Sequence, residues 1–71
     1  MREFETLSEI DQAAIGARVL TRLHNNPGCF TIDDLAAKRG NTVKELWAEL
    51  CIEAGAPDCT IPNRLRRAGQ A

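Results

Sequence analysis

The chain has 71 residues, 44% of them hydrophobic, and a formal net charge of −1. This length supports one small domain and excludes two. The near-neutral balance excludes the uniformly basic surface of strong nonspecific nucleic-acid binders. Because no apolar run reaches the roughly 20 residues that a membrane span needs, we expect a soluble protein without a membrane partner.

The cysteines bear on location and on metal binding. Cys29, Cys51 and Cys59 are an odd set that cannot all pair within the chain, and no apolar leader precedes the acidic N-terminus, so we expect a cytoplasmic protein. With His24 they would make a chemically acceptable zinc set, but no pair has the C-x-x-C spacing. We therefore predict no metal or other cofactor and interpret Cys29 and Cys51 as small buried hydrophobes.

A first helix is predicted over about residues 7–25. Thr6 and Glu9 have the spacing of a capping box, and Asn25-Asn26-Pro27-Gly28 is a strong stop signal because proline cannot continue the hydrogen-bond ladder. One face of this helix is expected in the core. That face carries Ile15, Val19, Leu20 and Leu23.

A second side of the same helix is also apolar. It carries Leu7, Ile10, Ala14 and Ala17, so the apolar arc is wider than one buried stripe requires. We favour its coverage by a later helix of the same chain. The alternative is contact with a second copy in a homodimer.

Two further helices are predicted over 32–39 and 42–54. Thr31 can cap the first, Lys38 and Arg39 suit its C-terminal end, and Gly40 is the expected stop. Asn41-Thr42 caps the second, and Gly55 followed by Pro57 is its expected end. In the second, apolar residues recur at spacings of three and four, and glutamates recur every four residues on another side. The apolar set is Val43, Leu46, Trp47, Leu50 and Ala54, and the acidic set is Glu45, Glu49 and Glu53.

The last segment is ambiguous between a helix and an extended piece. We favour a fourth helix over 60–68, with Thr60 as its cap and Pro62 in its first turn, and keep a short extended piece over 59–61 as the alternative. The expected fold is all-α, a three- to four-helix bundle in one domain. Its predicted core is Ile15, Val19, Leu20, Leu23, Phe30, Leu35, Val43, Leu46, Trp47 and Leu50.

The pattern Leu35-Ala36-x-x-x-Gly40-x-x-x-x-x-Leu46 resembles the helix-turn-helix motif, with a small alanine at the helix contact, a glycine at the turn and a leucine beyond it. With the preceding helix, residues 15–55 resemble the trihelical core of small bacterial and phage regulators, including winged-helix proteins. The wing is missing, since Pro57 and Pro62 leave little room for two strands after Gly55.

The resemblance implies a DNA-binding transcriptional regulator that acts as a homodimer, because one such module buries too little surface for specific affinity. The second helix of the motif would present Thr42, Lys44, Glu45, Trp47 and Ala48 to the major groove. Phosphates would be held by cations around it. These cations are Lys38, Arg39, Arg64, Arg66 and Arg67.

The acidic side of the same helix supports an alternative, a protein-binding module or phage-type inhibitor that docks on a basic protein. Glu45, Glu49 and Glu53 would oppose a phosphate backbone, and Trp47 could serve as an exposed hot spot. The competing interpretation of Trp47 is a plug of the small core, which we favour. The basic cluster of residues 63–67 is either a phosphate or acidic-protein site or a solvated tail.

An enzyme is not expected. His24 has no evident partner for nucleophilic chemistry, and the carboxylates are spaced as helix surfaces and caps. The chain also lacks a glycine-rich phosphate loop.

Overall fold

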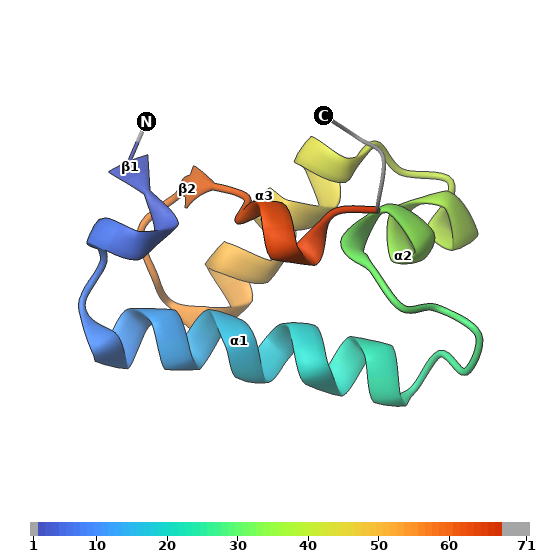
Figure 1. The fold of residues 1–71 in the computed structure, drawn as a ribbon, viewed down its shortest axis with the longest axis horizontal. Coiled ribbons are helices and arrows are strands. Elements are labelled where there is room, and N and C mark those ends of the chain that lie inside the picture. The colour runs from blue at the N-terminus through green and yellow to red at the C-terminus, as the bar shows by residue number, and fades with distance from the viewer. Residues whose placement is uncertain (1, 68–71) are drawn as a thin grey trace.

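A computed structural model describes residues 2–67. Most of this part is helical, with two strands of two residues each, which confirms the all-α prediction at the level of fold class. α1 runs along one side of the molecule, and the other elements pack on one flank of it (Figure 1). In chain order the elements are β1 (Arg2–Glu3), the 3-10 turn η1 (Phe4–Thr6), α1 (Glu9–His24), α2 (Ile32–Arg39), α3 (Val43–Ala54), β2 (Cys59–Thr60) and the 3-10 turn η2 (Asn63–Leu65).

The start of α1 differs from the predicted capping box at Thr6. Ser8 is the N-cap, and its hydroxyl accepts a hydrogen bond from the backbone N–H of Asp11 at 3.1 Å. Thr6 instead donates its hydroxyl to the Glu3 carbonyl at 2.7 Å within η1. This turn buries Phe4 and Leu7 before the helix begins, so the helix starts later than predicted.

The predicted ends of α2 and α3 are confirmed. Thr31 and Thr42 each form a complete capping box, in which the threonine hydroxyl accepts from the third helical residue and that residue's carboxylate accepts from the cap backbone. Both helices end at a glycine in the left-handed region, Gly40 with φ 75° and Gly55 with φ 67°. These local signals position the two helices.

The predicted fourth helix over 60–68 is wrong for the residues described, and Ala68 lies outside them. β2 pairs in parallel with β1, with Arg2 opposite Cys59 and Glu3 opposite Thr60. Pro62 then caps the short turn η2. Pairing with β1 keeps the chain extended at 59–60, as the alternative interpretation expected, and Asn63–Leu65 form a 3-10 turn in place of an α-helix.

The core lies between α1, α2 and α3 and confirms most of the predicted set. Six predicted residues are buried, namely Ile15, Val19, Leu35, Leu46, Trp47 and Leu50. Leu23 and Val43 pack partly buried against them. Seven buried residues were absent from the predicted core, namely Phe4, Leu7, Ile32, Ala36, Cys51, Cys59 and Pro62.

Two predicted core residues are exposed, Leu20 at 68% and Phe30 at 81%. Leu20 follows Val19, and one residue turns about 100° around an α-helix, so it leaves the covered face. Phe30 lies before the Thr31 cap, where its backbone N–H donates to the Asp34 carboxylate at 2.9 Å. The fully buried Ile32 fills the core there instead.

The second apolar side of α1 is not covered by a later helix. Leu7 is buried before the helix, but Ile10 is 81% exposed and Ala17 is exposed within the described part of the chain. On another flank of α1, Leu20 and Leu23 line a hollow together with Arg64 and Leu65 of η2. The favoured interpretation of this side is therefore wrong for Ile10 and Ala17.

Candidate functional site on α2 and α3

The two middle helices are joined by a tight turn. Gly40 ends α2, and the backbone N–H of Asn41 donates to the Ala36 carbonyl at 2.9 Å, which closes the helix end. Thr42 then caps α3 directly. Ala36, the small residue of the motif, is buried where the helices pack, and Leu46 is fully buried in α3.

The outward side of α3 is sparse in charge. Thr42 and Lys44 are exposed, Ala48 is half-buried, and Ile52 is 79% exposed. Lys44 makes no salt bridge within residues 2–67. Within the described residues, one unpaired cation, the exposed carboxylate of Glu45 and several small or apolar side chains therefore face outward from this helix.

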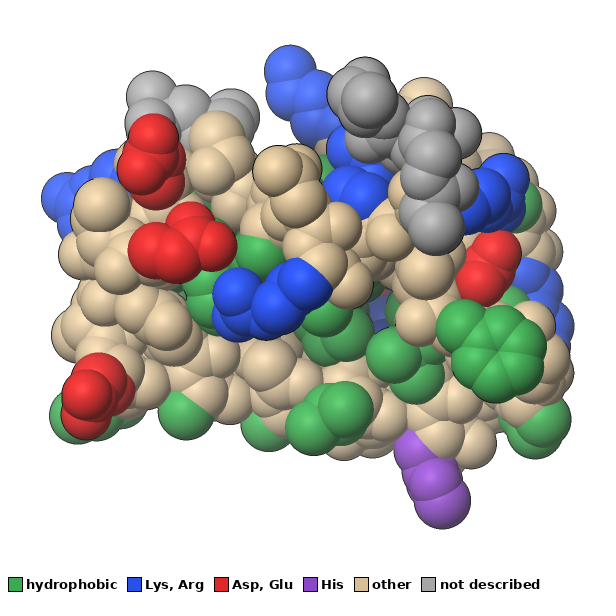
Figure 2. Space-filling view, viewed as in Figure 1, with side chains coloured by type: hydrophobic (Ala, Val, Ile, Leu, Met, Phe, Trp, Pro, Cys, Tyr) green, Lys and Arg blue, Asp and Glu red, His purple; other side chains and the backbone are tan. Residues whose placement is uncertain are grey.

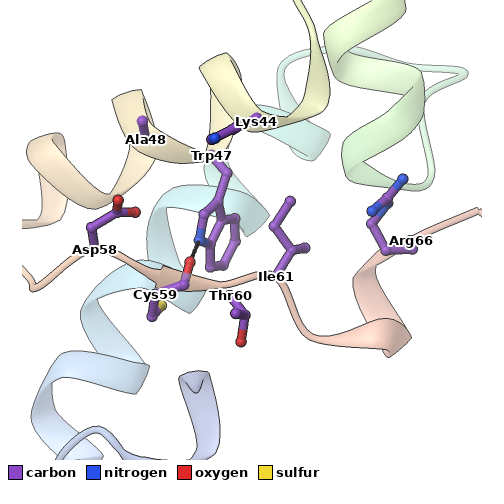
Figure 3. A pocket seen from close by; sticks show the side chains of 8 residues that line it. All are labelled: Lys44, Trp47, Ala48, Asp58, Cys59, Thr60, Ile61 and Arg66. Carbon is purple, nitrogen blue, oxygen red and sulfur yellow. Dashed lines mark hydrogen bonds between the residues drawn. The ribbon is translucent and has the colours of Figure 1, made fainter. Parts of the chain in front are cut away.

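A hollow of about 450 Å³ borders this side of α3. Lys44, Trp47 and Ala48 face the segment that carries Asp58, Cys59 and Ile61, and Arg66 lies at its far end (Figure 3). Lys44, Asp58 and Arg66 thus place both positive and negative charge around a hollow whose remaining lining is mostly apolar.

Trp47 is a core residue, as favoured from the sequence, and is 3% exposed. Its indole N–H donates to the Cys59 carbonyl at 2.6 Å, so it connects α3 to β2. Phe4 meets the indole edge to face, with ring centroids 6.2 Å apart. This burial leaves no exposed indole for a protein partner.

The three glutamates of α3 do not form a free acidic surface. The Glu45 carboxylate accepts from the Thr42 backbone at 2.9 Å, and this bond lowers its pKa. Glu49 accepts from Arg39 of α2 at 2.9 Å and from Arg22 of α1 at 3.0 Å. Hydrogen bonds from these two arginines lower the pKa of Glu49, and Arg39 has the larger effect.

Arg22 links α1 to α3, because it also pairs with Glu53. Hydrogen bonding to Glu49 raises the pKa of Arg22. The pairs span 27 and 31 residues of sequence, so no local spacing could have revealed them. Two arginines and two glutamates here neutralise one another.

The C-terminal arginines are also paired. Arg66 donates twice to Asp33, at 3.0 and 3.2 Å, which lowers the pKa of that carboxyl, and Arg67 pairs with Asp34 at 3.0 Å. Arg64 is 3.7 Å from Glu5 and lies over the Phe4 ring, 5.4 Å from its centroid. These arginines therefore hold the chain end against η1 and α2.

Lys38, at the C-terminal end of α2, is the other predicted DNA-contacting cation without a salt bridge in the described range. Lys44 likewise has no salt bridge in that range. Of the eight predicted DNA-contacting residues, the structure leaves these two as unpaired cations and Thr42 and Ala48 as uncharged neighbours, while Arg39, Arg64, Arg66 and Arg67 are in ion pairs.

Cys51 and Cys59 are buried neighbours, whereas Cys29 is half-buried. Burial raises the pKa of the Cys51 thiol to about 12, so it stays protonated at neutral pH. No group of three or more His, Cys, Asp or Glu side chains in residues 2–67 is placed to hold a metal ion.

None of the described helices combines the length and apolar character needed to cross a membrane. Comparisons with protein-family models, with curated proteins and with solved structures found no match to this chain.

Proposed function

We propose that this chain is a small cytoplasmic DNA-binding regulator of helix-turn-helix type, which presents the outward side of α3 to the major groove. The observation that carries the proposal is the position of the glutamates. Glu49 and Glu53 are bound to arginines of α1 and α2, away from the side that carries Lys44 and Ala48. The charges of these two glutamates are thus neutralised within the fold, and Glu45 is the glutamate of α3 that keeps a charge unpaired within residues 2–67 near the proposed DNA-facing side.

The residues of this side have distinct roles in the proposal. Thr42 caps α3 and Lys44 lies in its first turn, and both reach base edges or nearby phosphates. Ala48 gives close apolar contact, and Lys38 of α2 contacts the backbone. With two cations on this surface that are unpaired in the described residues, Lys38 and Lys44, affinity is modest and strongly salt-dependent.

The alternative function, docking of an acidic α3 on a basic protein, has less support. Glu49 and Glu53 each already bind an arginine, and the side chain of Trp47 is buried. A basic partner would have to displace Arg22 and Arg39 before it could use these carboxylates.

The test is fluorescence anisotropy of labelled duplex DNA titrated with protein over a series of salt concentrations. We expect binding at low salt, and Lys44→Gln should lower the slope of log affinity against log salt by about 1. Arg2→Gln is the matched control, since Arg2 is exposed on β1 and outside the proposed surface. Absence of binding at low salt, or equal effects of the two substitutions, would refute the proposal.

A further inference from the structure

The outer side of α1 is apolar and uncovered in the described part of the chain. Ile10 and Leu20 are among the four most exposed large hydrophobic residues, and Ala13 and Ala17 beside them are exposed too. α1 forms one edge of the molecule in Figure 1, and Figure 2 shows hydrophobic side chains along that edge. Exposed apolar patches of this kind are typical of protein–protein interfaces.

Next to this side lies a hollow of about 300 Å³. It is lined by Ala14, Ala17, Arg18 and Thr21 of α1 and by Ala54 of α3. Ile10 protrudes from the same helix seven residues before Ala17, which is about 10 Å along the axis and nearly two whole turns. One side of α1 therefore carries a protruding side chain near its start and a hollow near its middle.

We infer that a second copy of this chain docks on α1, with the two helices antiparallel about a two-fold axis. Such an interface requires that each surface be complementary to itself, so that if residue i contacts j, then j contacts i. Antiparallel pairing places Ile10 over the hollow beside the partner's Ala17, and the reciprocal contact forms at the other end. The small side chains around the hollow let the helices approach closely.

The charges on one flank of α1 fit the same arrangement. Asp11 and Arg18 are also seven residues apart, so they lie on one flank, and neither makes a salt bridge within residues 2–67. An axis midway between them sets Asp11 opposite the partner's Arg18, and sets Arg18 opposite the partner's Asp11. This axis lies one residue, about 1.5 Å along the helix, from the midpoint of Ile10 and Ala17, so a single two-fold axis serves the apolar contact and pairs these charges twice.

This dimer leaves the outward side of α3 open. Glu49, Glu53 and Ala54 face α1, whereas Lys44 and Ala48 lie on the other side of α3. Each copy therefore keeps its own DNA-facing surface outside the interface. The inference rests on α1 alone and does not require the proposed DNA binding.

Sedimentation equilibrium of the full chain without DNA tests the apolar contact. Wild type should dimerise, and Ile10→Ala should weaken the dimer about tenfold or more, because the change is made at two symmetric sites. Ile52→Ala is the matched control, since Ile52 is as exposed as Ile10 but lies on α3, and it should leave the dimer unchanged. A wild-type monomer at millimolar concentration would overturn the inference.

Charge reversal tests the direction of the helices. Asp11→Arg and Arg18→Asp should each weaken self-association several-fold by placing like charges opposite each other, and an equimolar mixture should recover it, since each reversed charge then meets an opposite one. Arg2→Asp makes the same charge change as Arg18→Asp on β1, outside the proposed interface, and should leave self-association unchanged. If the equimolar mixture does not regain wild-type self-association, the antiparallel arrangement is wrong. DNA binding by a strictly monomeric protein would refute the dimer and leave the proposed function standing.

Discussion

Replacing Trp47 by phenylalanine should destabilise the domain more than any change on its surface. The substitution removes the indole N–H that donates to the Cys59 carbonyl at 2.6 Å, but it keeps an aromatic ring against Phe4. A buried acceptor left without its donor costs about 1–3 kcal/mol. The smaller ring also leaves a void of roughly 35 Å³, which at ~24 cal/mol per Å³ adds about 1 kcal/mol.

The sum, about 2–4 kcal/mol, is large for a chain of this length. Domains of 71 residues have a free energy of unfolding of roughly 4–10 kcal/mol, at 0.05–0.15 kcal/mol per residue. Urea unfolding followed by far-UV circular dichroism measures the difference without depending on the indole fluorescence that the variant loses. Ile52→Ala is the control and should change the free energy of unfolding by less than about 0.5 kcal/mol, because Ile52 is exposed.

The reasoning would be refuted if Trp47→Phe lost less than about 1 kcal/mol, the lower limit for an unsatisfied buried acceptor. A loss similar to that of Ile52→Ala would mean that the bond to Cys59 contributes nothing and that β2 is held by other contacts.

Three further outcomes are expected. Gly16→Ala should raise the free energy of unfolding by about 0.5–1 kcal/mol, because the added Cβ in the middle of α1 meets nothing within 4 Å. Gly40→Ala should lower it by about 1–2 kcal/mol, because φ is 75° there; thermal melts of the two variants should shift in opposite directions. The lowered pKa of Glu49 means that its contribution is present at neutral pH and is lost as pH falls below the usual 4.5 and through the folded value. Urea midpoints measured against pH should therefore fall less steeply in acid for Arg39→Met than for wild type, and an unchanged acid slope would contradict this assignment.

Features set by neighbouring residues could be predicted from the sequence. The capping residues Thr31 and Thr42 and the stop glycines Gly40 and Gly55 act within one helical turn, and each is where the pattern placed it. Trp47 was expected in the core because it shares the apolar spacing of its helix, and it is buried.

Features that depend on distant segments could not be predicted. The burial of Phe4 and Cys59 follows from the pairing of β1 with β2, and two-residue strands leave no periodic pattern. The ion pairs of Arg22 with Glu49 and Glu53 likewise join helices far apart in sequence. Spacing could show that the glutamates of α3 lie in one line, but it could not show which cations would meet them.

The parallel pairing of Arg2 with Cys59 has a consequence for how the chain folds during synthesis. α1, α2 and α3 can assemble as they leave the ribosome, but Phe4 and Leu7 precede them and gain their cover from segments that include the much later residues 59–65. Closing so long a loop carries an entropic cost before its contacts form, so we expect this pairing to form after the local helices. Phe4 and Leu7 then gain their full cover only in the last step of folding.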